Sequence, residues 1–298
     1  MKKVIFHIGN HKTGTTTLQK FLFKNRKILK KYNLLYSNIG IKFGDYGHHN
    51  LSYELGNFSQ YDSKYGDYKK FIKVIKQNKD KNILVSSENF ECLEFNKKFE
   101  KFIKEIKNLK LKIIVIFFFR NKESLYQSMI AELVKSGFYF EKKNHPQIIK
   151  SIKKNKYFEY NKHRYWFHKK KEIEMIKKNF KIKKSNIICI QYRSNKTISL
   201  FLDKILEKKI KKKFWRENLI FPKNVNIRNG YYKTLNINLV NKFKALIVDL
   251  RLNNLIITLT SLISVLFKIL YITFLSGFFE NNQKKFLKKE HLYMLKKI

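Results

Sequence analysis

Short apolar runs alternate along this chain with longer amphipathic segments. The runs are rich in β-branched and aromatic residues, which favour strands buried on both faces of a sheet. They occupy residues 4–8, 83–85, 112–119 and 187–190. Between them, apolar residues recur at helical spacing opposite lysines, which predicts helices over residues 16–31, 68–77, 97–108, 124–136, 163–180 and 198–209. Strands that alternate with helices predict an α/β fold, with a mostly parallel central sheet between two helical layers.

Two regions depart from this alternation. Residues 39–67 contain five glycines among tyrosine, histidine and asparagine, which predicts an ordered loop of the kind that lines sites. Residues 255–279 are apolar except for Lys268 and six serines and threonines. Their length suits a bilayer span of about 20 residues, whereas the polar residues favour buried helices that close the domain. We therefore predict an α/β domain over residues 1–215 and a helical C-terminal region over 216–298, with both placements of 255–279 open.

The chain is strongly basic, with 65 lysine and arginine residues, 22 acidic residues and a formal charge of +43. Such a charge favours an anionic partner such as nucleic acid, acidic lipid or polyanionic glycan. Only two alanines and two prolines occur, however, which is typical of an A/T-rich coding bias that also enriches lysine. We therefore do not predict nucleic acid as the partner. Contact with an anionic membrane surface through the C-terminal segment stays an open alternative.

The cysteines and the N-terminus bear on location. Cys92 and Cys189 are too few and too far apart for a disulfide framework, and neither has a ligand partner at zinc spacing. The N-terminus enters an apolar strand after three residues, which is too soon for a signal peptide. We expect a cytoplasmic protein that needs no metal and is membrane-associated only if residues 255–279 make that contact.

The first predicted strand ends in Gly9 and is followed by Asn-His-Lys-Thr-Gly-Thr-Thr-Thr and then by a helix. The first N–H groups of a helix lack helical partners and lie at the positive end of its dipole, so they attract an anion. Gly9 and Gly14 allow the backbone to approach that anion closely. The segment predicts a phosphate-binding loop.

The spacing of this loop is close to that of nucleoside-triphosphate loops, Gly-x-x-x-x-Gly-Lys-Ser/Thr. Gly9 and Gly14 match the glycines, and Thr16 supplies the hydroxyl. Thr15, however, stands where the lysine that contacts the β- and γ-phosphates should be, and the lysine lies three residues earlier, at Lys12. A kinase-like nucleotide-dependent enzyme is therefore the second hypothesis.

The run Lys12-Thr13-Gly14-Thr15-Thr16 resembles the Lys-x-Gly-Thr-Thr loop of the sulfotransferase superfamily, and residues 7–19 are especially similar to bacterial members. The resemblance covers about residues 1–205. It implies a P-loop-like α/β fold and the donor 3′-phosphoadenosine 5′-phosphosulfate (PAPS), which leaves as 3′-phosphoadenosine 5′-phosphate (PAP). The residues implied in donor binding here are His11, Lys12, Thr13, Gly14, Thr15, Thr16 and Thr17.

A donor with a 3′-phosphate needs a second anion site beside the same sheet. Arg120 stands at the carboxyl end of the predicted strand 112–119, where such sheets bind ligands, and Ser128 follows eight residues later in a predicted helix. In sulfotransferases an arginine and a serine in this pattern hold the 3′-phosphate, and the guanidinium suits that role. Arg228, in Asn-Ile-Arg-Asn-Gly, is the candidate for the basic, glycine-containing loop that usually completes the family's nucleotide site.

In-line sulfuryl transfer needs a base on the nucleophile and a cation on the bridging oxygen. Lys12 is the candidate cation. Glu88 is the first candidate base because it follows the predicted strand 83–85, and the family keeps a histidine or glutamate near this place. His48 and His49 are the alternatives, on the loop expected to line the site, with an ordinary imidazole pKa of about 6.5.

Three functions are compatible with these features. The first is sulfuryl transfer from PAPS to a hydroxyl or amine of a glycan, a glycolipid or a small metabolite, with no metal required. The second is a kinase of the same broad fold, which would need Mg²⁺ and an acidic ligand such as Glu88. The third is a basic membrane-surface or nucleic-acid-binding protein without catalysis, which leaves the phosphate-binding loop unexplained.

Overall fold

A computed structural model describes residues 2–10, 12–92, 96–135, 144–160, 163–193 and 196–222. The described residues fall into two compact units, one made of residues 2–120 and 159–222 and the other of residues 121–158. The first unit contains the sheet and the phosphate-binding loop, and the second contains two helices. Each is described by itself.

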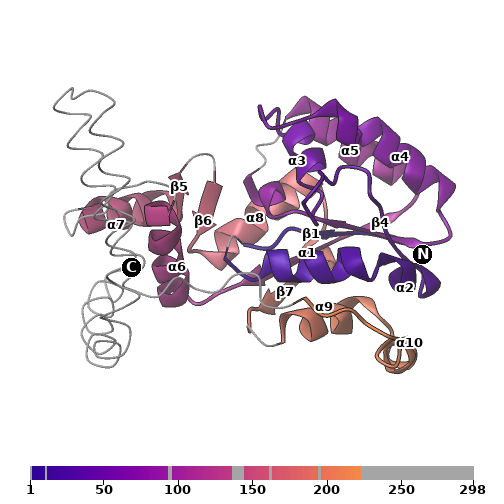
Figure 1. Ribbon diagram of the computed structural model, residues 1–298. Coiled ribbons are helices and arrows are strands. Elements are labelled where there is room, and N and C mark those ends of the chain that lie inside the picture. The colour runs from indigo at the N-terminus through magenta and orange to yellow at the C-terminus, as the bar shows by residue number, and fades with distance from the viewer. Residues whose placement is uncertain are drawn as a thin grey trace, which may run out of the picture. The chain divides into compact units, whose positions relative to one another are not determined.

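The first unit is built on a five-stranded sheet with the order β2-β3-β1-β4-β7. Its strands β1, β4 and β7 are labelled in Figure 1. The strands are β1 (Lys3–His7), β2 (Leu34–Tyr36), β3 (Asn82–Ser86), β4 (Lys112–Phe119) and β7 (Ile187–Gln191). Each neighbouring pair is parallel, and His7 at the end of β1 is in register with Ser86 at the end of β3. The carboxyl ends of these strands therefore share one edge of the sheet, where α/β folds place their sites.

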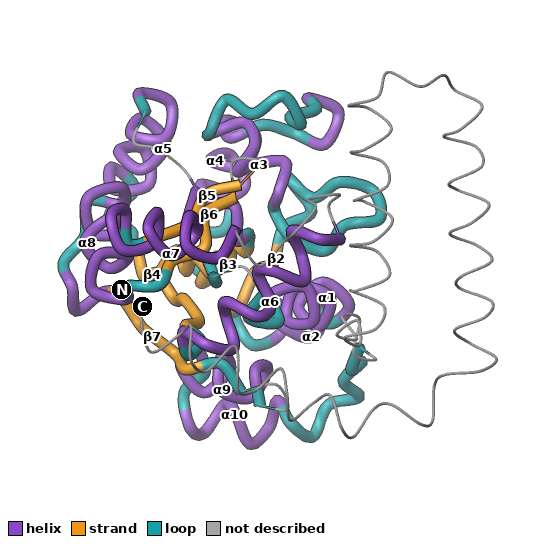
Figure 2. The backbone as a smooth tube through the Cα atoms, turned by 90° about the vertical axis from the view of Figure 1, so that its left-hand side faces the viewer, coloured by secondary structure: helices purple, strands orange, loops and turns teal. Residues whose placement is uncertain are grey.

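Helices cover both faces of the sheet. One layer consists of α3 (His49–Leu55), α4 (Tyr68–Gln77), α5 (Lys97–Asn108) and α8 (Lys169–Phe180). The other consists of α1 (Thr15–Lys24), α2 (Arg26–Lys31), α9 (Thr197–Ile205) and α10 (Lys208–Phe214). Figure 2 shows the two layers on opposite sides of the strands, with α4 and α5 on one side and α9 and α10 on the other. The prediction of a three-layer α/β/α arrangement is confirmed in this unit.

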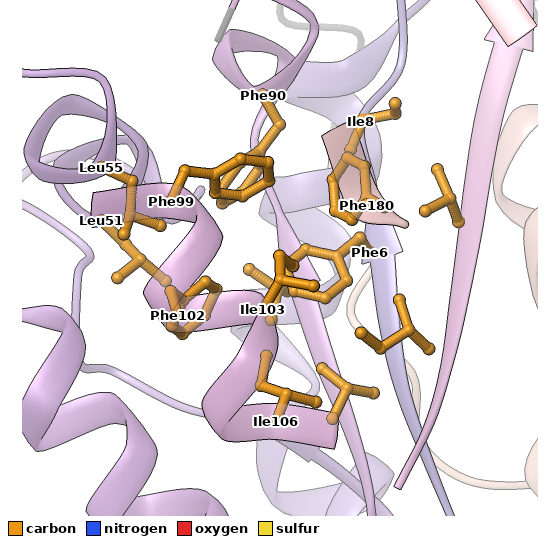
Figure 3. Close-up of a cluster of buried hydrophobic side chains, with 14 of the residues drawn as sticks. Phe6, Ile8, Leu51, Leu55, Phe90, Phe99, Phe102, Ile103, Ile106 and Phe180 are labelled. Carbon is orange, nitrogen blue, oxygen red and sulfur yellow. The ribbon is translucent and has the colours of Figure 1, made fainter. Parts of the chain in front are cut away.

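Alternating side chains of the strands create two cores. One core, on the side of α3, α4, α5 and α8, contains Val4 and Phe6 of β1 and Ile8 just after it. Ile5 of the same strand belongs to the other core. Phe6 lies at the centre of an aromatic cluster (Figure 3), with its ring centroid 5.6 Å from that of Phe90 and 5.0 Å from that of Phe180. Such edge-to-face contacts add to the burial of apolar area. They hold β1, and therefore the start of the loop after it, in place.

Several predicted elements differ in their bounds. The predicted helix 16–31 is two helices separated at Asn25, whose side-chain amide donates to the carbonyl of Phe21 and also to that of Ile220. The predicted helix 198–209 is also two, α9 and α10. The predicted helix 163–180 begins as strand β6 (His163–Trp166), which pairs with β5 (Tyr157–Tyr160), and α8 starts only at Lys169.

Short elements account for the other differences. The predicted loop 39–67 contains α3 and the 3₁₀ helix η1 (Ser63–Tyr65), and two further 3₁₀ helices occur, η2 (Glu88–Cys92) and η3 (Lys184–Asn186). The three-residue strand β2 was not predicted because it is too short to show a pattern. The helices predicted over 68–77 and 97–108 are present with those bounds.

The second unit contains α6 (Lys122–Lys135) and α7 (Asn144–Asn155). The first was predicted over 124–136, and the second was not predicted. Each has buried apolar side chains, among them Leu125 and Met129 on α6 and Ile148 and Ile152 on α7.

The C-terminal predictions fall almost entirely outside the described residues. Segment 255–279 and all of the region beyond residue 222 are among the residues whose structure is not described. Within the part that is described, no helix combines the length and the apolar character that a membrane crossing requires.

Candidate functional site

The predicted phosphate-binding loop connects β1 to α1 and is tied to the sheet at its base. The backbone N–H of Asn10 donates to the carbonyl of Phe118 on β4 over 3.3 Å. The buried hydroxyl of Thr13 donates to the carbonyl of Asn10 over 2.5 Å. Lys12 and Gly14 have left-handed backbone conformations, with φ of 67° and 73°. These two residues turn the chain so that it enters α1 directly above the end of β1.

The first turn of α1 presents backbone donors. Gly14 is its N-cap, and no side chain among the described residues caps the helix. Thr15 begins the helix, and Thr16 and Thr17 follow in the same turn. The free N–H groups of this turn and the positive end of the helix dipole can therefore hold an anion.

Thr15 occupies the position that a lysine fills in nucleoside-triphosphate loops. The side chain of Thr15 is buried, and its methyl carbon lies 2.6 Å from where a Cβ on Gly9 would be. A Cβ at Gly9 would also lie 3.0 Å from Nε2 of His7. The small side chain of Thr15 thus packs inside the loop. It leaves no room for a Cβ at position 9, so glycine is required there.

Arg120 and Tyr192 support the loop from the neighbouring strands. Arg120 follows β4, and its Nη1 donates to the carbonyl of Lys12 over 2.9 Å. Its guanidinium carbon lies 5.2 Å from the ring centroid of Tyr192. Tyr192 follows β7, and its Cε2 lies 2.9 Å from where a Cβ on Gly14 would be. The structure therefore brings the predicted Arg120 to the predicted loop.

The contact between Gly14 and Tyr192 gives a stability prediction. We expect Gly14→Ala to lower the free energy of unfolding by about 3 kcal/mol, because alanine would pay for a left-handed backbone and would also clash with the Tyr192 ring. Gly44 is the matched control, since it has φ of 82° and no atom within 4 Å of its Cβ position. Gly44→Ala should cost only about 1–2 kcal/mol. Urea unfolding measures both, and equal losses would contradict the packing of Tyr192 on the loop.

Two of the three candidate bases lie side by side. Nδ1 of His49 is 3.9 Å from Oε2 of Glu88, and the two side chains are 14% and 17% exposed. Gln19 of α1 donates from Nε2 to the same Glu88 oxygen over 2.8 Å. Nδ1 of His49 lies 3.0 Å from the hydroxyl oxygen of Ser87. Partial exposure leaves both groups accessible to a substrate, while Gln19 connects Glu88 to the helix that follows the phosphate-binding loop.

His48, the third candidate base, lies in the core. It is fully buried, with its ring centroid 4.7 Å from that of Tyr36, and Nδ1 accepts from the N–H of Ser86 over 3.2 Å. Burial lowers the pKa of His48 to about 3. His7 is also buried, with Nδ1 2.7 Å from the hydroxyl oxygen of Ser86, and burial lowers its pKa to about 4. Both imidazoles are therefore neutral at physiological pH and remote from solvent.

For the other predicted residues, the described structure gives no position at this site. His11 and Arg228 lie outside the described residues. Ser128 is on α6, in the second unit, whereas Arg120 ends a segment of the first unit. Their joint role at a 3′-phosphate stays a prediction.

Three contributors to the site were missed from the sequence: Gln19, Asn10 and Tyr192. Gln19 carried a usable signal, because it is a polar residue beside Leu18 on the buried side of an amphipathic helix. Asn10 and Tyr192 carried no such signal. Asn10 contacts α8 through its side chain, and Tyr192 packs on Gly14 of the loop, and sequence spacing predicts neither contact.

No group of three or more histidine, cysteine, aspartate or glutamate side chains within the described residues could hold a metal ion. Comparisons with protein-family models, with curated proteins and with solved structures find no match for this chain.

Proposed function

We propose that this protein is a sulfotransferase that moves the sulfuryl group of PAPS to a hydroxyl or amine of a glycan, a glycolipid or a small metabolite. The observation that carries the proposal is the loop between β1 and α1. Its lysine is at position 12, and the position of the triphosphate-binding lysine is filled by the buried Thr15. A loop of this kind retains donors for one phosphate group and lacks the cation that reaches a γ-phosphate.

The proposed fold is the P-loop-like variant of the three-layer arrangement. The central position of β1, with the loop at its carboxyl end and α1 directly after it, supports this assignment. The hydrophobic helical extension proposed for residues 216–298 lies beyond the described chain except for its first residues.

The donor would bind with its 5′-phosphosulfate at the N-terminus of α1. Backbone N–H groups of the first turn and the hydroxyl of Thr16 would contact the phosphate oxygens. Lys12 would stabilise the negative charge that develops on the bridging oxygen as the bond to sulfur breaks. Arg120, which lies next to the loop, would contact the 3′-phosphate. Ser128, His11 and Arg228 are further proposed donor contacts, which the resemblance to sulfotransferases implies.

The chemical step would be an in-line displacement at sulfur. The acceptor oxygen or nitrogen forms a bond to sulfur while the bond from sulfur to the bridging oxygen breaks, and PAP leaves with the electron pair. The acceptor proton passes to a base. Glu88 is the proposed base because it is partly exposed, and the hydrogen bond from Gln19 and the nearby ring of His49 orient its carboxylate. No metal takes part in this scheme.

A kinase is the second candidate, favoured by the spacing of Gly9, Gly14 and Thr16. It would use Glu88 as a ligand of Mg²⁺. The buried threonine at position 15 argues against it, since a triphosphate would lose its main cationic contact there. A membrane-surface protein without catalysis would have no use for the loop geometry.

A transfer assay tests the proposal. Purified protein is incubated with sulfate-labelled PAPS and with cell-envelope fractions or a panel of hydroxyl and amine acceptors. We expect label to move to an acceptor and PAP to accumulate in equal amount, without added Mg²⁺. Label transfer from γ-labelled ATP in place of PAPS would support the kinase instead.

The assignment of the base gives a separate prediction. Glu88→Gln should lower kcat by about 10²–10³-fold, because a glutamine cannot accept the acceptor's proton. His49→Asn should lower kcat by about ten-fold, through the loss of a neighbour that orients the carboxylate. The rate of PAP formation with a saturating acceptor measures both, with urea unfolding as the control for folding. A larger loss in His49→Asn than in Glu88→Gln would reverse the two roles.

A further inference from the structure

A buried carboxyl group contacts the phosphate-binding loop from α8. Glu172 is 2% exposed, and its Oε2 accepts a hydrogen bond of 3.2 Å from Nδ2 of Asn10. Asn10 is itself 2% exposed and belongs to the loop. Neither residue takes part in the sulfuryl transfer scheme, and a carboxyl group is rarely buried to this extent without a cation at its side.

The hydrogen bonding of this pair is incomplete in a specific way. Oε1 of Glu172 and Oδ1 of Asn10 are both buried, and neither has a hydrogen-bond partner among the described residues. Both atoms are acceptors while the carboxyl group is ionised, so they cannot bond to each other. A protonated carboxyl group changes this, because it adds one O–H donor to the pair. A carboxylic acid and a primary amide can then exchange two hydrogen bonds, and both buried oxygens are satisfied.

We propose that Glu172 is a positioning residue of the phosphate-binding loop, and that it acts as a neutral carboxylic acid. Its Oε1–H donates to Oδ1 of Asn10 while its Oε2 accepts from Nδ2 of the same amide. The two hydrogen bonds fix the side chain of Asn10. The backbone of Asn10 is in turn held by Phe118 and Thr13, so the path of the loop is set at this residue.

The surroundings of Glu172 favour the neutral form. Burial raises the pKa of Glu172 to about 8, against the opposing effects of the Asn10 hydrogen bond and of Lys169. The ammonium of Lys169 lies 3.8 Å from the ring centroid of Phe119. On β7, burial raises the pKa of the Cys189 thiol, while Lys169 opposes this rise and Glu172 adds to it. From β4 and α5, apolar side chains such as Phe117 and Phe99 share a core with α8. The charged residues Glu100 and Lys107 of α5 contact Lys181, the C-cap of α8, at the end of the helix away from its first turn.

Ionisation of Glu172 would alter the loop in two ways. The pair would lose the donor to Oδ1 of Asn10, and a negative charge would appear beside a loop that must accept an anion. Anion binding should therefore weaken as the pH rises above about 8. At neutral pH Glu172 is mostly protonated, so the phosphate-binding loop keeps the conformation that binds the anion.

Urea unfolding of the ligand-free protein tests the pair directly. The pKa of Glu172 is higher in the folded protein than its ordinary value of 4.5, so its contribution to stability is complete below pH 4.5 and is lost as the pH rises to about 8. Glu172→Gln keeps both hydrogen bonds and does not ionise. We expect the urea midpoint of wild type to fall between pH 5 and 8 relative to that of E172Q. Glu174→Gln, an exposed position on the same helix, is the matched control and should follow wild type.

Binding of PAP, measured by calorimetry at pH 6.5 and pH 9, is the second arm, and it rests on the proposed function. The dissociation constant of wild type should rise about ten-fold more than that of E172Q over this range. Asn10→Ala should weaken binding at both pH values, because the loop loses its anchor. If no variant binds PAP, the proposed function fails while the urea comparison still decides the pair. Parallel urea profiles of wild type and E172Q would overturn the inference.

Discussion

Lys12→Met is expected to lower kcat for sulfuryl transfer by about 10²–10³-fold, with little change in the stability of the ligand-free protein. Methionine keeps much of the length of the lysine side chain and removes its charge. The charge is needed most when the bond between sulfur and the bridging oxygen breaks, so the loss should appear in kcat more than in the affinity for PAP. The left-handed backbone at this position, with φ of 67°, has the same energetic cost for lysine and for methionine.

The matched control for this change is Lys24→Met, at the exposed C-terminal end of α1, the helix that follows the loop. It removes an equal charge from α1 without touching the loop, and kcat should stay at the wild-type value. Steady-state rates with saturating donor and acceptor measure both variants. A Lys12→Met variant with wild-type kcat would remove Lys12 from the chemistry.

Arg120→Ala should weaken the binding of PAP by about 10–100-fold, which is the usual loss for charge-assisted hydrogen bonds to a phosphate. Adenosine 5′-phosphosulfate, which lacks the 3′-phosphate, should lose much less affinity, because Arg120 would then act only through its hydrogen bond to the carbonyl of Lys12. The difference between the two ligands isolates the contact with the 3′-phosphate.

Arg193→Ala is the control for the loss of one positive charge near this edge of the sheet, since Arg193 is exposed and follows Tyr192. Its affinity for both ligands should match that of wild type. Calorimetry with the two nucleotides measures all three proteins. Equal losses for both ligands in Arg120→Ala would show that this residue only supports the loop.

The fold could be predicted where local pattern and tertiary structure agree. The four predicted strands are apolar runs bounded by polar residues or glycine, and α4 and α5 have a single uninterrupted apolar face. The predictions were wrong where distant contacts decide. Asn25 separates α1 from α2, and its side-chain amide bonds to the carbonyl of Ile220, 195 residues away. No local sequence pattern predicts a hydrogen-bond partner so far along the chain.

The candidate site divides in the same way. The loop and Arg120 could be predicted because their positions at the carboxyl ends of strands follow from the strand pattern alone. His48 and His49 are adjacent in sequence, yet one is in the core and the other lies beside the partly exposed Glu88. The difference in burial between the two histidines depends on the residue at which α3 begins next to the carboxyl end of β3. The role of Glu172 could not be predicted, because its contact with Asn10 spans 162 residues.

Calorimetry of the purified protein with PAP and, separately, with ATP and Mg²⁺ tests the central claim most directly. A loop with Lys12 in place of a lysine at position 15, with Arg120 beside it, predicts tight binding of PAP without a metal and weak binding of ATP with Mg²⁺. Tight binding of ATP with Mg²⁺ and no binding of PAP would contradict the proposed sulfotransferase.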